Sequence, residues 1–297
     1  LALLCRGLGV VYKRQYLSYA VVMTEFDPSS FETITVEIAD HVGWVTLDRP
    51  ESMNAFNLTM QREVRATWMA FRELDEVRVA VLTAAGDRAF CVGIDRDQPF
   101  SALDDRPGLY GTSNNFMYDD PGDDLGPKSC DLWKPVIAAV NGVCCGGAFY
   151  FIAECDIIIA AEHATFFDPH VTYGMAAVYE PMKMLQRMPL GEILRLSLLG
   201  NHERMTAATA ERIGLVSEVV PGEQLVESAR WLADAIASQS PTAVAGTLRA
   251  IWAANDLGRE QALSMAASIL TTGTDTAALA AGAEAFGSGR RIEPRTR

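Results

Sequence analysis

The sequence has no excess of basic residues, and this bears first on what the protein binds. Lysine and arginine number 25 against 38 aspartates and glutamates, so the net charge is −13 at pH 7. Proteins that bind nucleic acid or anionic membrane surfaces usually present a basic face. We therefore expect neither kind of partner, and an anionic ligand would need local basic groups.

Cysteines at metal-ligand spacing are also lacking. The chain has 6 cysteines, and no two of them form a C-x-x-C pair. A chain of 297 residues can bury a full core without a disulfide framework. We predict buried, reduced thiols in a cytoplasmic protein and no metal site.

No apolar run reaches the roughly 20 residues that a bilayer requires. The segment 1–22 comes nearest, but Arg6, Lys13 and Arg14 interrupt it. Its charges do not precede the apolar run, as they would in a secretory signal. We interpret residues 1–22 as a non-native or disordered extension and expect the native protein to start at Met23.

What the sequence does contain is the periodicity of an α/β protein. Apolar and polar residues alternate over 31–38, and a second strand-like stretch follows at 42–47, so the two together predict a hairpin. Continuous apolar runs at 79–82, 135–140 and 155–160 predict buried strands. Asn57 is expected to cap a helix, and residues 145–153 to form a second, short one. From Thr206 onward the pattern predicts almost only helix. The order is strand–strand–helix units followed by a helical region.

One interval differs in composition. Residues 95–124 contain eight aspartates and two arginines, with several prolines and glycines. Polarity and helix breakers together indicate a solvated surface loop. The functional alternative is a lid over a pocket.

Three stretches stand out together by order and spacing. They are TLDRPESMNAF at 46–56, VLTAAGDRAFCVGID at 81–95 and KPVIAAVNGVCCGGA at 134–148. Their joint occurrence resembles the enoyl-CoA hydratase/isomerase family, the crotonase superfamily, and TAATAERIGLV at 206–216 resembles a further segment of it. The resemblance covers residues 31–221 and continues more weakly to the C-terminus.

The resemblance implies an α/β, crotonase-like (ClpP/crotonase) fold, a spiral of strand–strand–helix units. It implies a core over 23–221 and a C-terminal helical region over 222–297. In the family that region builds trimers or dimers of trimers, so we expect a homo-oligomer.

Gly146 and Gly147 open a short helix directly after a strand and an Asn-Gly turn. A helix start leaves backbone N–H groups unpaired and partly positive, and glycine lets a ligand approach them. A thioester oxygen placed there would be stabilised as it becomes an enolate oxyanion. The N–H of Gly147 is thus one candidate donor, and the motif match supplies the N–H of Ile94 as the second.

The resemblance also implies a coenzyme A site. Family members line it with residues that here are Ser52, Met53, Ala55, Ile94, Asp95, Arg96 and Gly147, mostly through the backbone. Arg49 and Arg88 are nearby cations that could meet phosphates. Coenzyme A enters as part of the substrate, and no bound cofactor, flavin or nicotinamide is implied.

Both glutamates that a hydratase of this family uses are replaced. Three residues after Gly147 stands Tyr150, and the stretch FFDPH at 166–170 places His170 at the second position. A histidine titrates near neutrality and can replace a carboxylate in proton transfer. We expect His170 to do so, Asp168 to orient it, and Tyr150 to donate a proton or hydrogen bond. Tyr179 and Glu180 are further candidate pocket groups.

We therefore expect an enzyme that acts on an acyl-CoA thioester through an enolate held in an oxyanion hole. Whether it is a lyase, an isomerase or a C–C hydrolase stays open. One alternative is hydrolysis of a C–C bond in a β-diketone by His170 and Asp168, which need not involve CoA. The other is a CoA-binding homologue without catalytic activity.

Overall fold

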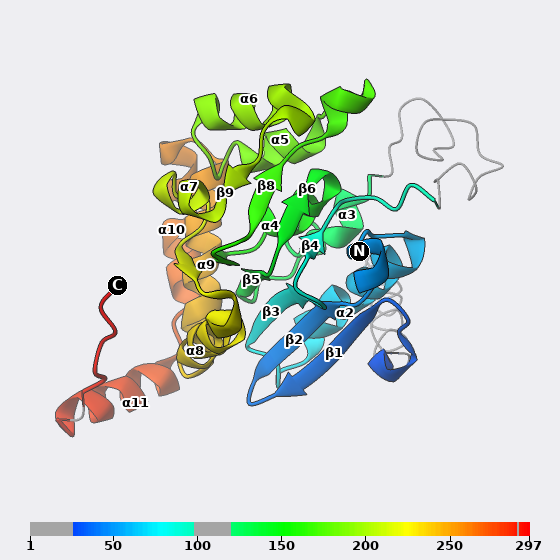
Figure 1. Ribbon diagram of the computed structural model, residues 1–297. Helices are drawn as coiled ribbons and strands as arrows, with labels where there is room; N and C mark the ends of the chain where they lie inside the picture. The colour runs from blue at the N-terminus through cyan, green and yellow to red at the C-terminus, as the bar shows by residue number, and fades with distance from the viewer. Residues whose placement is uncertain (1–25, 98–119, 290) are drawn as a thin grey trace, which may run out of the picture.

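The computed structural model describes residues 26–97, 120–289 and 291–297, which form two sheets surrounded by helices (Figure 1). The strands are β1 (Ile34–Ala39), β2 (Val42–Leu47), β3 (Val79–Ala84), β4 (Ala89–Cys91), β5 (Val136–Val140), β6 (Val143–Cys145), β7 (Ile157–Ala161), β8 (Thr165–Phe167), β9 (Met205–Thr206) and β10 (Glu218–Val220). The larger sheet has the strand order β1-β2-β3-β5-β7-β10 and the smaller β4-β6-β8-β9.

Successive turns of the chain add one strand to each sheet. β3, β5 and β7 lie parallel in the larger sheet, and each is followed at once by β4, β6 or β8 in the smaller one. The predicted hairpin is confirmed, since β1 pairs antiparallel with β2. The apolar runs at 79–82, 135–140 and 155–160 are buried strands, as predicted. This alternation is the spiral of strand–strand–helix units expected from the motifs.

Helices account for most of the regular structure outside the strands. They are α2 (Leu58–Glu73), α3 (Gly122–Leu125), α4 (Phe149–Ile152), α5 (Tyr179–Met184), α6 (Leu190–Leu199), α7 (Ala207–Arg212), α8 (Leu225–Ala237), α9 (Pro241–Asp256), α10 (Arg259–Thr272) and α11 (Thr276–Gly287). Asn57 caps α2, as predicted, because its Oδ1 accepts the N–H of Met60 at 2.9 Å. Trp68 and Phe71 of α2 are fully buried, whereas α8 packs its alanines on the opposite face of the larger sheet.

The C-terminal region is helical, with one exception to the prediction: residues 218–220 form β10, which completes the larger sheet beside β7. α9 and α10 pack closely where Gly246 faces Gly273. α11 projects away from the rest of the molecule (Figure 1). No helix in the described ranges is long and apolar enough to cross a membrane.

Two predictions concern segments that are partly or wholly outside the described residues. Residues 1–22 lie outside them, as do 98–119 of the acidic interval. At the described ends of that interval Asp95 and Asp120 are buried, whereas Arg96, Asp97 and Asp123 are exposed. The cysteines at 91, 130, 144, 145 and 155 are buried and free, as predicted, and burial raises the pKa of the Cys91 thiol to about 12.

Candidate active site

The two predicted oxyanion donors come from chain segments in direct contact. Gly93 adopts φ +86°, and a Cβ built on it would lie only 3.0 Å from the backbone N of Gly147. Phe56 forms a parallel bridge with Ile94 by bonding to Gly93 and Asp95 on either side. The N–H of Ile94 therefore points away from Phe56. Gly147 lies in the first turn of the helical segment that leads into α4, where N–H groups lack partners within the helix.

His170 lies beside this corner. It begins a 3₁₀ turn, His170–Tyr173, after β8, and a Cβ built on Gly146 would lie 3.8 Å from its Cε1. Its Nδ1 contacts Asp168 Oδ1 at 2.5 Å, and its backbone N–H donates to the same oxygen at 3.1 Å. Asp168 is fully buried. The hydrogen bond to Asp168 is the main cause of a raised His170 pKa, and it leaves Nε2 as the nitrogen available for proton transfer.

Tyr150, on α4, is buried and donates its hydroxyl to Asp120 Oδ2 at 3.0 Å. Burial, followed by the charges of Glu180 and Asp120, raises the pKa of Tyr150 far above its ordinary range. The phenol therefore keeps its proton near neutrality and can act as a hydrogen-bond donor but not as a base.

Sequence reasoning missed Asp120. It stands 30 residues before Tyr150 and lies in the acidic interval whose composition indicates a solvated loop. Its Oδ1 accepts the N–H of Gly122 at 2.9 Å, so the Asp-Pro-Gly turn that opens α3 fixes its side chain. That turn was the one local signal in the sequence. Burial raises the Asp120 pKa.

Glu180, suggested by the sequence only as a pocket candidate, is part of the cluster. It belongs to α5, is 4% exposed, and its Oε1 lies 3.5 Å from His170 Nε2. Burial raises its pKa. One turn along α5, Lys183 bonds Glu154 Oε1 at 2.6 Å and so holds the helix against the segment after α4. Tyr179, the residue before Glu180, packs on the hydrophobic core instead.

The segments predicted to line a coenzyme A site lie next to one another. Ser52 ends a 3₁₀ turn, and Met53 follows in the left-handed region at φ 54°. Arg49 ties this loop to the other segment, because its guanidinium donates to the Ala55 carbonyl at 2.6 Å and pairs with Asp95 at 2.8 Å.

The charge of Arg49, a candidate phosphate contact, is balanced by Asp95 at 2.8 Å. The coenzyme A site at these two segments stays a prediction. Arg96 is exposed and stacks on the Tyr173 ring at 3.7 Å. Arg88 is exposed, with its Nη2 3.0 Å from the Met53 sulfur.

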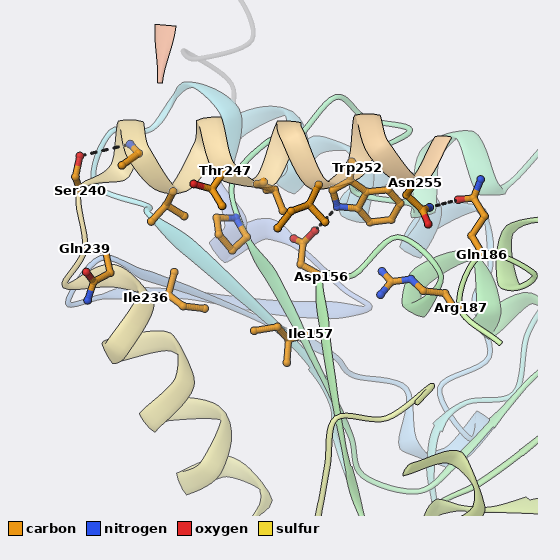
Figure 2. Close-up of a pocket in the computed structure, with 15 residues that line it drawn as sticks. Asp156, Ile157, Gln186, Arg187, Ile236, Gln239, Ser240, Thr247, Trp252 and Asn255 are labelled. Atoms are coloured by element: carbon orange, nitrogen blue, oxygen red, sulfur yellow. Dashed lines mark hydrogen bonds between the residues drawn. The ribbon is translucent and has the colours of Figure 1, made fainter. Parts of the chain in front are cut away.

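Figure 2 shows a separate cavity of about 630 Å³ between α8, α9 and the sheet. Trp252 donates to Asp156 Oδ1 at 2.7 Å within it. Pro135, Asp156 and Ile157 lie where β5 and β7 begin, whereas ligands of parallel sheets usually bind where strands end. None of the predicted site residues lines this cavity, so we do not assign it to the active site.

Comparison with known proteins shows the family and the fold. The family model described as enoyl-CoA hydratase/isomerase matches residues 37–293. The chain belongs to the enoyl-CoA hydratase/isomerase family. The crotonase-type fold and the assignment as an enzyme of this family, both expected from the motifs, are confirmed.

Similar proteins include hydratases from distant organisms. The chain is 32% identical to (E)-benzylidenesuccinyl-CoA hydratase of Thauera aromatica over 86% of this chain and 96% of that protein. It is 36% identical to mevalonyl-coenzyme A hydratase of Aspergillus fumigatus over 71% of this chain and 74% of that protein. An enoyl-CoA hydratase/isomerase structure from Mycobacterium paratuberculosis superposes with a TM-score of 0.80 at 36% identity, covering 90% of this chain and all of that one.

Proposed function

We propose that this enzyme forms or protonates the enolate of an acyl-CoA thioester, with His170 as its acid–base group. The N–H groups of Ile94 and Gly147 would hold the enolate oxygen, and removing one such donor typically costs about 10²–10³ in kcat. The backbone of the segments 52–55 and 94–96 would bind the coenzyme A portion. The similar hydratases named above, each of a CoA thioester, support this substrate class.

The observation that carries the proposal is the 2.5 Å contact between His170 Nδ1 and Asp168, beside the glycine corner. A buried carboxylate on Nδ1 fixes the imidazole orientation and stabilises its protonated form. The hydrogen bond to Asp168 raises the pKa of His170 and so favours the protonated ring, from which Nε2 can deliver a proton to an enolate carbon. Tyr150 would contribute a hydrogen bond.

The same histidine–aspartate pair supports a second candidate, hydrolysis of a β-diketone. His170 would take a proton from water as its oxygen adds to one carbonyl carbon, the C–C bond would break, and its electron pair would form an enolate at the oxyanion donors. His170 would then protonate the enolate carbon, and a carboxylic acid and a ketone would leave. Such a substrate needs no coenzyme A.

Kinetics on a panel of enoyl-CoA thioesters and β-diketones test the proposal. We expect slow hydration of crotonyl-CoA, because the paired glutamates are replaced, and faster turnover of another thioester. His170→Ala should lower kcat/KM by about 10²–10⁴, the usual contribution of a general acid–base group. Asp234→Asn on the exposed face of α8 serves as a control that should match wild type.

The alternatives give different results on the same panel. Turnover of diketones alone would favour the hydrolase. Coenzyme A binding without turnover of any substrate would favour a non-catalytic homologue. Rapid crotonyl-CoA hydration that His170→Ala leaves unchanged would contradict the assigned role of His170.

A further inference from the structure

Five side chains of the site form a continuous series of contacts. Asp168 contacts His170 Nδ1, and Glu180 Oε1 lies 3.5 Å from Nε2 of the same ring. Glu180 also lies close enough to Tyr150 for each group to affect the pKa of the other, and the Tyr150 hydroxyl donates to Asp120. The contacts join β8, α5, α4 and the turn before α3, segments that are far apart in the sequence.

The protons of this series can be counted. A phenol has one O–H, and that of Tyr150 points to Asp120 Oδ2 at 3.0 Å. It cannot also donate to Glu180, so Tyr150 gives no proton to the Glu180 carboxyl while the Asp120 bond is made. On its other side, Glu180 Oε1 can accept a proton from His170 Nε2.

The charges around this pair favour keeping one proton on it. His170 faces the carboxyls of Asp168 and Glu180, with Arg96 as a more distant cation, and Glu180 faces His170, Asp168 and Tyr150. Lys183, on the same helix as Glu180, is bonded to Glu154 and Ser129. An additional negative charge in so buried a cluster is costly. Burial accordingly raises the pKa of Glu180, and Asp168 raises that of His170.

We propose that Glu180 is the proton partner of His170, so that one proton is shared between Nε2 of His170 and Oε1 of Glu180. Glu180 then acts through His170, as a positioning residue for the proton. This inference rests on the proposed enolate chemistry. In the productive step the N–H bond at Nε2 breaks, a C–H bond forms with the electron pair of the enolate, and neutral imidazole is left beside ionised Glu180. The reverse step takes a proton from the same carbon.

The first experiment compares Glu180→Gln and Glu180→Asp with wild type on whichever panel substrate is turned over. Glutamine keeps the size and polarity but cannot take up a proton. We expect Glu180→Gln to lower kcat by about 10²-fold or more with KM within about threefold, and Glu180→Asp to recover part of the rate. The matched control is Glu227→Gln, an exposed carboxylate on α8.

The pH profile separates this role from a merely structural one. The charge of Glu180 raises the pKa of His170. Removing that charge should therefore move the limb of the pH–rate profile that reports His170 ionisation to lower pH. A Glu180→Gln variant with wild-type kcat and an unshifted profile would overturn the proposal, as would an Asp variant no better than Gln.

A second experiment does not depend on turnover. NMR titration of the His170 ring should give a lower pKa in Glu180→Gln than in wild type and an unchanged one in Glu227→Gln. An identical His170 titration in Glu180→Gln and wild type would refute the shared proton. If no panel substrate reacts, the proposed function fails, whereas this titration still decides the role of Glu180.

Discussion

Asp168 shows at the residue scale how one buried carboxylate sets the chemistry of its neighbour. Oδ1 bonds both the ring and the backbone N–H of His170, and Oδ2 is buried with no hydrogen-bond partner in the part of the chain that the structure describes. Burying a carboxylate is costly unless a charged or hydrogen-bonding neighbour compensates it. Here that neighbour is the imidazole, whose protonated form the carboxylate stabilises.

Replacing Asp168 by asparagine should therefore weaken catalysis through His170. The hydrogen bond to Asp168 is the largest cause of the raised His170 pKa, so the variant should show a lower pKa for that group. We expect kcat/KM to fall by about 10²-fold, within the range for a lost acid–base contribution. The limb of the pH–rate profile that reports His170 ionisation should also move to lower pH. An unchanged profile in Asp168→Asn, measured beside Asp234→Asn, would argue against the pair.

Stability should also depend on pH at these residues. The folded-state pKa values of His170 and Glu180 are both raised, so the native state holds their protons more tightly than the unfolded chain does. The free energy of unfolding must then decrease as pH rises through the raised values, by about 1.4 kcal/mol for every tenfold difference in proton affinity between the folded and unfolded states. For His170 the stabilising contribution is complete below the ordinary pKa of about 6.5.

Urea unfolding of wild type and Glu180→Gln checks this sign. A buried glutamate with a raised pKa destabilises the folded state once it ionises, whereas glutamine does not ionise. From about pH 4.5 upward, wild type should therefore lose stability relative to the variant. A stability difference that stays constant between pH 4 and pH 8 would show that Glu180 ionises equally well in both states.

At the scale of elements, the oxyanion corner depends on a close approach of two loops. A Cβ on Gly93 would meet the backbone N of Gly147 at 3.0 Å, and φ +86° is unfavourable for any other residue. Gly93→Ala should push the segments of Ile94 and Gly147 apart and lower kcat by about 10²–10³, the contribution of one oxyanion donor.

A matched glycine tests whether position matters. Gly191, on α6, has nothing within 4 Å of a built Cβ and no positive φ. Gly191→Ala should leave kcat unchanged and stability equal or slightly higher, because alanine suits a helix better. Equal activity of the two alanine variants would mean that the Gly93 loop does not set the donor geometry.

The elements also show why some of the fold could be predicted from the sequence. β3, β5 and β7 have apolar runs of strand length, and α2 has a capped helical period, so physical pattern alone identifies them. β4, β6 and β8 span three residues each, too few for any period, and their pairing depends on the spiral that brings them together. The acidic interval has the composition of a solvated loop, and composition alone does not reveal that the side chain of Asp120 is buried.

The site divides in the same way. Ile94, Gly147 and His170 could be named because they stand in motifs with fixed spacing. Asp120 and Glu180 stand in none, and they reach Tyr150 and His170 only through the packing of α3 and α5 around α4. Glu180 could be named only as a candidate pocket group, and Asp120, which contacts Tyr150 from 30 residues earlier in the chain, could not be named at all.

For the whole molecule, the C-terminal helices carry apolar side chains that the described part of this chain does not cover. Leu270 of α10 is 70% exposed, and Leu279 and Phe286 of α11 are 60% and 75% exposed. Single exposed apolar residues are ordinary, but a series along neighbouring helices marks an association surface. The projection of α11 away from the body suits contact with another copy (Figure 1).

We therefore predict that the protein assembles as a trimer or a dimer of trimers through this region. Light scattering at micromolar concentration should give that mass for wild type. Leu279→Asp combined with Phe286→Asp should shift the mass toward monomer, because each aspartate would place a charge in a desolvated contact. Gln224→Asp adds a charge outside these helices, at an exposed position before α8, and should leave the mass unchanged. A wild-type monomer, or a double variant that assembles like wild type, would mean that these helices are not the contact. Because His170 lies on the 3₁₀ turn after β8 and Glu180 on α5, outside α9–α11, the dissociated variant should keep the His170 titration of wild type even where its assembly is lost.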